Sequence, residues 1–287
     1  MKTIKTIVNK YLRKGYDIPH SQSAACQEIL LNKIASSNMA DKVLLKGGVV
    51  IFNMTQNLRR ATIDLDFDFI RYDISNESIK LFADLLNRSD EYKVSIIRIE
   101  DLHQEDYQGK RVWTTVSDKT YSIHFKLDIG VHTLLSIEQS SACFYFDNDN
   151  GLILKVNPPE QIFAEKLYSL AKHGAKSTRF KDINDLYFFI KNNMLNKDMV
   201  KKCIDLLLLC KTQIKSLNDI CDIVSETFKN DDYIENFIDA KDKWLDVDYK
   251  DIFESILDFI YSIWFLRYKL VKNSYSKKLI NFIYNAF

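Results

Sequence analysis

Residues 62–70 read Thr62-Ile-Asp64-Leu-Asp66-Phe-Asp68-Phe-Ile70, a strict alternation of polar and apolar side chains. A period of two is typical of a half-buried β-strand, because successive side chains point to opposite faces of a sheet. Three carboxylates are therefore expected on one face of this strand. The other face is expected to be buried and to carry Ile63, Leu65, Phe67 and Phe69.

A second alternating stretch, residues 121–129, predicts another strand of the same sheet. Its apolar face carries Tyr121, Ile123, Phe125, Leu127 and Ile129, and its polar face ends in Asp128. If the two strands are neighbours, Asp128 adds a carboxylate to those of the first strand. Taken alone, Asp128 is equally well interpreted as an acid at a strand end.

Shorter runs predict further strands at 43–45, 91–100, 111–117, 144–146 and 152–156, and residues 1–40 and 75–87 have helical patterns. From Pro159 on, helical periodicity dominates, with runs at 159–173, 180–193, 197–215, 216–229, 231–244, 249–270 and 275–286. The sequence thus predicts an α+β protein. A mixed-sheet domain over residues 1–156 is expected before an all-helical domain over residues 157–287.

Composition excludes several classes of protein. Of 287 residues, 46% are hydrophobic and 28% are charged, which is too apolar for a disordered chain, and the net charge of +1 excludes a histone-like protein. The five cysteines are odd in number and contain no CxxC pair, and no signal peptide or membrane-spanning run is recognised. A cytoplasmic protein without a membrane partner or a zinc site is expected.

Asp64, Asp66 and Asp68 repel one another unless a cation lies between them, and hard divalent cations prefer such oxygen ligands. A solvent-facing acidic strand is the alternative interpretation. An EF-hand is excluded, because Phe69 and Ser75 stand where that loop needs Gly and Glu.

Gly47-Gly48 follows the apolar run Val43-Leu44-Leu45. Adjacent glycines let the backbone approach a ligand closely and direct N–H groups at phosphate oxygens. A simple tight turn is the alternative. The surrounding sequence fits neither GxxxxGK[ST] nor GxGxxG, so a P-loop or a Rossmann site is not expected.

Five blocks occur in a characteristic order between residues 40 and 190. They are Leu45-Lys46-Gly47-Gly48, Arg60-Ala-Thr62-Ile-Asp64-Leu-Asp66-Phe67, Lys126-Leu-Asp128-Ile, Pro159-Glu160-Gln-Ile-Phe-Ala-Glu165-Lys166-Leu and Arg179-Phe-Lys181-Asp182-Ile-Asn-Asp185-Leu-Tyr187. This set resembles the AbiEii/AbiGii-type nucleotidyltransferase toxins of the polymerase-β-like superfamily. Val49 departs from the pattern where the family often has Thr or Ser, and the interval from Gly48 to Asp64 is longer than usual.

The resemblance implies a mixed-sheet nucleotidyltransferase core and a set of site residues. Asp64, Asp66 and Asp128 would hold Mg²⁺ or Mn²⁺, and Gly47 and Gly48 would hold the triphosphate of an NTP. Lys46, Arg60 and Thr62 would also belong to the nucleotide site. The helical domain would contribute Lys166 and Asp182.

The residues of the last two blocks leave alternatives open. Lys166 lies at i±4 between Ile162 and Leu170, so an ordinary packed or ion-paired helix residue is as compatible with the pattern as a phosphate ligand. Asp182 and Asp185 fit the positive end of a helix. A cluster of basic residues between the blocks is either a solvated turn or a binding site for a triphosphate or an RNA backbone: Lys172, His173, Lys176, Arg179 and Lys181.

The sequence therefore predicts a Mg²⁺-dependent enzyme that transfers NMP from an NTP to a hydroxyl acceptor. The resemblance implies tRNA as one acceptor, and a toxin of a bacterial toxin–antitoxin or phage-defence pair with a cognate antitoxin as partner. Two rival hypotheses use the same residues: a metal-dependent nuclease or phosphohydrolase, and a binding scaffold without catalysis.

Overall fold

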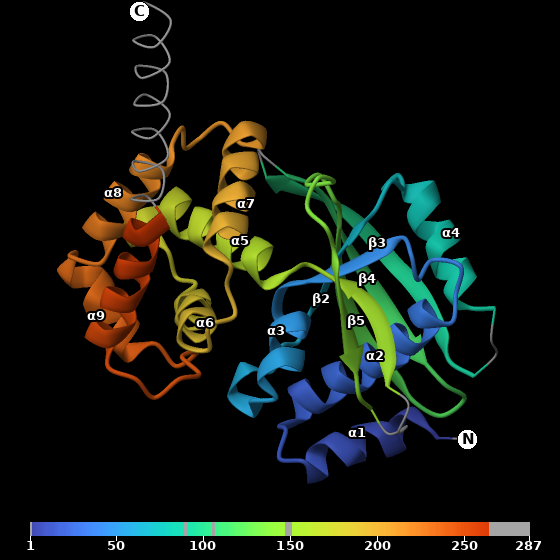
Figure 1. Ribbon diagram of the computed structural model, residues 1–287. Coiled ribbons are helices and arrows are strands. Elements are labelled where there is room, and N and C mark those ends of the chain that lie inside the picture. Colours follow the sequence, from blue (N-terminus) through green and yellow to red (C-terminus); the bar gives the residue numbers. More distant parts are fainter. Residues whose placement is uncertain (1, 89–90, 105–106, 147–150, 264–287) are drawn as a thin grey trace, which may run out of the picture. The chain divides into compact units, whose positions relative to one another are not determined.

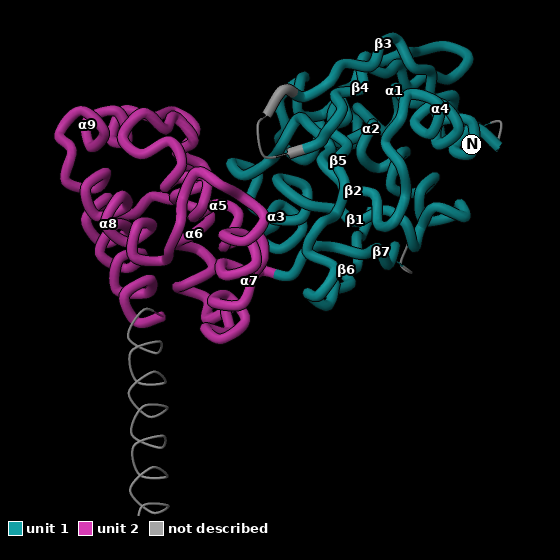
Figure 2. Tube along the Cα trace, turned by 90° about the horizontal axis from the view of Figure 1, so that it is seen from above, with its two compact units in different colours: residues 1–158 teal, residues 159–287 magenta. Residues whose placement is uncertain are grey.

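The computed structural model describes residues 2–88, 91–104, 107–146 and 151–263. The chain divides into two compact units, residues 1–158 and 159–287, which are coloured separately in Figure 2. Unit 1 holds the β-sheet and unit 2 is helical (Figure 1). The predicted α+β class is confirmed.

Within the described residues, unit 1 contains a seven-stranded sheet in the order β3-β4-β5-β2-β1-β7-β6. The sheet is mixed, because β2 is parallel to β5 and β1 is parallel to β7, whereas the other neighbours are antiparallel. The strands are β1 (Val43–Lys46), β2 (Leu65–Phe69), β3 (Lys93–Gln104), β4 (Tyr107–Ser117), β5 (Ser122–Val131), β6 (Ser140–Phe144) and β7 (Leu152–Val156).

The apolar face of β2 is covered by a helix. Leu65, Phe67 and Phe69 are fully buried, and the ring of Phe82 lies 5.6 Å from that of Phe67 and 5.2 Å from that of Phe69. Phe82 belongs to α4, one of the helices of unit 1: α1 (Ile4–Arg13), α2 (Ile18–Ala35), α3 (Gly47–Thr55) and α4 (Asn76–Leu86). The aspartates of β2 alternate with these buried residues and point to the opposite face.

Unit 2 packs its helices around an aromatic core that includes Phe163, Phe189, Tyr233, Phe237 and Trp244, all fully buried. Its helices are α5 (Pro159–His173), α6 (Phe180–Lys191), α7 (Lys197–Cys210), α8 (Leu217–Thr227), α9 (Asp231–Asp239) and a further helix over residues 249–263. A search of the described helices finds none that is both long and apolar enough to cross a membrane.

Several predicted boundaries are wrong. Strand β2 begins at Leu65, and Ile63, predicted to be buried, is 50% exposed because it precedes the paired part of the strand. Strand β6 covers 140–144 instead of 144–146, and α7 and α9 end at Cys210 and Asp239. The end of the predicted helix 249–270 and all of the predicted helix 275–286 lie outside the described residues.

Candidate active site

The carboxylates of β2 and β5 lie side by side on the face opposite α4. The parallel pairing of these strands places Asp66 directly beside Asp128, and neighbouring strands are about 4.8 Å apart. Asp64 immediately precedes β2 and contacts Lys126, which shares the polar face of β5 with Asp128. The structure therefore brings Asp64, Asp66 and Asp128 close to one another on one face of the sheet.

Cationic side chains neutralise the neighbours of Asp66. Arg111 binds Asp128 with two hydrogen bonds, from Nε to Oδ1 at 2.9 Å and from Nη2 to Oδ2 at 2.8 Å. The Lys126 ammonium lies 3.0 Å from Asp64 Oδ2. Asp68, which is buried, pairs with Lys46 at the end of β1. Asp68 is therefore engaged by a cation that pairs with none of the other three carboxylates.

The side-chain carboxylate of Asp66 has no hydrogen bond or ion pair with any of the described residues. Burial raises the pKa of Asp66 to about 6; nearby Lys46 and Lys126 oppose this rise, whereas Asp128 and Asp64 add to it. The carboxylate thus lies in a place where its negative charge is costly. A perturbed acid of this kind, clustered with other acids, is typical of functional sites.

The carboxylates fit a divalent cation by their chemistry. Among the described residues, no group of three or more His, Cys, Asp or Glu side chains is arranged so that it could hold a metal ion. However, Asp66 is an oxygen donor whose charge lacks a direct partner, and Asp64 and Asp128 flank it. Mg²⁺ and Mn²⁺ prefer oxygen ligands of this kind, so the chemistry of these side chains is compatible with the predicted cation.

The raised pKa of Asp66 predicts a stabilising substitution. Above about pH 6 the buried Asp66 carboxyl group is ionised, and this ionisation costs free energy in the folded state but not in the unfolded chain. Asp66→Asn removes this cost and should therefore raise the melting temperature at pH 8. The advantage should shrink as the pH falls from 6 towards 4, where the wild-type carboxyl group is protonated in the folded state. Thermal unfolding of both proteins in a chelator tests this. A variant less stable than the wild type at pH 8 would contradict the assigned environment.

Gly47 and Gly48 lie beside the carboxylates and begin helix α3. Gly47 has a φ of +66°, and a Cβ atom there would collide with Asp66 Oδ2; a Cβ on Gly48 would lie 2.6 Å from Thr62 Oγ1. The first turn of α3 has no side-chain cap. The first N–H groups of a helix and the positive end of its dipole suit an anion, and in α3 they begin beside Asp66.

The other residues predicted for the nucleotide site surround this turn. Lys46 precedes it and pairs with Asp68, and Thr62 packs against Gly48. Arg60 is buried in a short 3-10 turn, Leu58–Arg60, which places it beneath the surface. Val49, which departs from the pattern of the resemblance, is buried within α3 and contributes to the core.

The two predicted residues of unit 2 contact each other. The ammonium of Lys166 on α5 binds Asp182 in the first turn of α6, and it lies 3.0 Å from Asp185 Oδ2. Arg179 adds a second cation, with its Nε 2.7 Å from Asp182 Oδ2. Asp185 is completely buried and accepts a 2.9 Å hydrogen bond from Trp244 Nε1.

The basic residues near Gly174 differ in exposure. Lys176 and Arg179 are exposed, whereas Lys172 and Lys181 are half-buried. Arg179 is already engaged by Asp182, so this cation contributes to the cluster around Lys166. Of the predicted acceptor-binding residues, Lys176 presents its charge most openly.

Residues that hold the site in place were not singled out in the sequence. Arg111 orients Asp128 from β4, and Gln27 on α2 donates to the carbonyl oxygens of Thr62 and Asp64, at 3.1 and 3.0 Å. Trp244 supports Asp185 from 59 residues away. Only strand register or tertiary contact reveals these roles. In the sequence, only the polar side chain of Arg111 in a predicted strand indicates a residue that could contact the site.

Comparisons with known proteins identify the family of the chain. The sequence matches the family described as "Nucleotidyl transferase AbiEii toxin, Type IV TA system" over residues 28–262. No curated protein matches the chain. Similar solved structures include JHP933 from Helicobacter pylori, with 17% identity, a TM-score of 0.47 and coverage of 93% of this chain and 99% of that one. A "putative nucleotidyltransferase from H. pylori" has 16% identity, a TM-score of 0.47 and coverage of 87% and 97%. The family match spans most of the chain, and the chain therefore belongs to the AbiEii toxin nucleotidyltransferases of type IV toxin–antitoxin systems.

Proposed function

We propose that this nucleotidyltransferase transfers NMP from an NTP to a hydroxyl of RNA in a reaction that depends on Mg²⁺ or Mn²⁺. The observation that carries the proposal is the pairing of Asp66 with Asp128, directly beside the Gly47-Gly48 turn. Carboxylates that suit a cation and backbone N–H groups that suit a phosphate thus meet at one end of β1 and β2. The family adds an NTP substrate and a cognate antitoxin.

In this proposal each residue of unit 1 has a stated task. Asp64, Asp66 and Asp128 hold the divalent cation, which would neutralise charge on the transferring phosphoryl group when bound. The N–H groups of Gly47 and Gly48 bind the phosphates that leave as pyrophosphate, with Lys46, Arg60 and Thr62 shaping that pocket. Asp128, held in orientation by Arg111, accepts the proton of the attacking hydroxyl.

We propose that Lys166 and Asp182 of unit 2 also take part in nucleotide transfer. The ammonium of Lys166 has three N–H donors, of which Asp182 and Asp185 engage two. We assign the third to a phosphate oxygen of the NTP, with Asp182 holding the ammonium in place. Lys172, Lys176, Arg179 and Lys181 are proposed to bind the acceptor backbone. The proposed acceptor class includes tRNA, and the proposed biological role includes defence against phage.

The function can be tested with labelled substrates. The protein should be incubated with each α-labelled NTP, Mg²⁺ and total bacterial RNA, and the RNA and protein fractions then separated. Label in RNA together with stoichiometric pyrophosphate is expected. Hydrolysis of RNA or NTP without label transfer would favour the nuclease or phosphohydrolase hypothesis. Label in protein would remove RNA from the proposal.

A further inference from the structure

The face of the sheet that carries the carboxylates continues beyond them in two rows of side chains. Strand register places Arg111 beside Asp128 and Glu100 beside Arg111, from β5 across β4 to β3. The second row lies two residues further along each strand. There, Trp113 lies beside Lys126, and Arg98 lies beside Trp113. Residues paired in this way point to the same face, so Trp113 and Arg98 share the face of Asp128.

Trp113 is a half-buried aromatic residue held by two neighbours. The guanidinium of Arg98 lies over its ring, 5.0 Å from the centroid, and Nε1 donates a 3.1 Å hydrogen bond to Glu100 Oε2. Glu100 also pairs with Arg98, with Oε1 2.9 Å from Nε. The ring is thus fixed in orientation, whereas the side chain of Arg98 stays 59% exposed.

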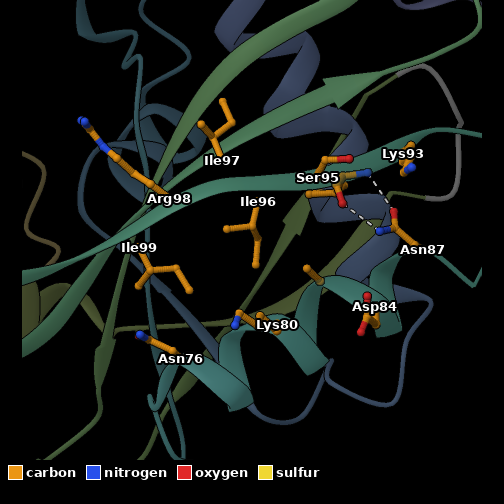
Figure 3. Close-up of a pocket in the computed structure, with 12 residues that line it drawn as sticks. Asn76, Lys80, Asp84, Asn87, Lys93, Ser95, Ile96, Ile97, Arg98 and Ile99 are labelled. Carbon is orange, nitrogen blue, oxygen red and sulfur yellow. Dashed lines mark hydrogen bonds between the residues drawn. The ribbon is translucent and has the colours of Figure 1, made fainter.

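A β-bulge widens this surface. The register between β3 and β4 shifts between Ile96 and Arg98, so Ile97 is the extra residue. Figure 3 shows the consequence: Ile97 and Arg98 point away from α4, whereas Ile96 and Ile99 point towards it. Ile97 is 55% exposed. The bulge therefore adds an apolar side chain to the face that carries Arg98 and Trp113.

The chemistry of transfer assigns a direction to this face. In an in-line displacement, the attacking hydroxyl and the departing pyrophosphate lie on opposite sides of the transferred phosphorus. The phosphate-binding turn Gly47-Gly48 lies on the β1 side of Asp66. The acceptor must then arrive from the β5 side, and β4 and β3 are the next strands in that direction.

We propose that Trp113, Arg98 and Ile97 form a stacking platform for a nucleobase of an RNA acceptor strand. This inference rests on the proposed function. Trp113 lies one strand and two residues from Asp128, a separation of about 8 Å between Cα atoms, which suits the base of a nucleotide whose hydroxyl reaches Asp128. Aromatic rings and arginine side chains stack on any base, and Arg98 adds positive charge that suits the backbone.

A binding experiment can isolate the base from the backbone. A short fluorescein-labelled single-stranded RNA with a free 3′-hydroxyl should be compared with the same strand lacking its terminal base. Wild-type protein is expected to bind the intact strand roughly 5- to 100-fold more tightly, as for other base–aromatic stacks. Trp113→Leu should lose this preference, whereas Trp113→Phe, which keeps a flat ring, should retain most of it.

Four controls keep the outcomes separate. Both variants should bind each NTP as the wild type does, and their RNA binding should keep the same dependence on salt, since the phosphate contacts remain. Asp66→Asn should keep the preference for the intact strand while losing transfer, so the platform and the chemistry are tested independently. Melting temperatures confirm that the variants fold.

The proposal is overturned by any of three results. Trp113→Leu with an undiminished preference would show that the base does not stack there. Weaker NTP binding by Trp113→Leu, with unchanged RNA binding, would place the NTP base on this platform. A wild-type protein that transfers label but binds both RNA strands equally would remove the platform and leave the proposed function standing.

Discussion

Asp66→Asn is expected to reduce nucleotide transfer by roughly 100- to 10 000-fold, because loss of the proposed metal ligand would remove several kcal/mol of charge stabilisation. Asp64→Asn should have a similar effect. Asp66 also has a pKa raised to about 6, so the same substitution should stabilise the fold. An inactive protein with a higher melting temperature is the combined result that the site predicts. Transfer of labelled NMP to RNA and thermal unfolding, measured on one preparation, give both values.

Controls for this experiment are available on the same sheet. Asp101 on β3 is an exposed carboxylate paired with Lys110, and strand alternation places it on the face opposite Glu100. Asp101→Asn should therefore leave transfer within about two-fold of the wild type, as surface substitutions rarely have larger effects. Added Mg²⁺ should raise the melting temperature of the wild type and change that of Asp66→Asn little. Full activity of Asp66→Asn would refute the assignment of the site.

Much of unit 1 was predictable because its strands alternate. The pattern of residues 62–70 predicted both the strand and the shared face of its aspartates, and β2 confirms that Phe67 and Phe69 are buried opposite them. The pairing of β2 with β5 could not be read from either strand. It is a long-range contact between residues 62 positions apart, Asp66 and Asp128, and local periodicity carries no information on it.

The partners of the site residues were less predictable than the residues themselves. Arg111 has the position of an ordinary polar strand residue, and only the antiparallel register of β4 with β5 directs it at Asp128. Similarly, the sequence left open whether Lys166 is ion-paired, and the structure shows two carboxylates at its ammonium. Asp185 is held by Trp244, which lies outside the matching blocks. Contacts of this kind depend on tertiary packing.

Lys166→Met is expected to lower the free energy of unfolding by about 3–5 kcal/mol, the usual effect of removing one partner from a buried ion pair. In the wild type, Lys166 and Arg179 balance Asp182 and Asp185, and the Lys166 and Asp185 side chains are 9% and 0% exposed. Methionine keeps the packed stem but removes the cation that lies 3.0 Å from Asp185 Oδ2. Urea unfolding followed by circular dichroism measures the loss, and hydrogen exchange should locate it in α5 and α6.

The double variant Lys166→Met/Asp185→Asn separates the structural role of Lys166 from its proposed phosphate contact. Asparagine at position 185 can still accept the hydrogen bond of Trp244 Nε1, and it removes the negative charge of Asp185. The double variant should therefore regain more than half of the stability that Lys166→Met loses. Lys201→Met is the matched control, since Lys201 pairs with Asp205 on the surface of α7 and should cost less than about 0.5 kcal/mol. If the double variant is stable and still fails to bind NTP, Lys166 acts on phosphate. If it binds NTP as the wild type does, Lys166 serves only the packing of unit 2, and the transfer site must be built without it.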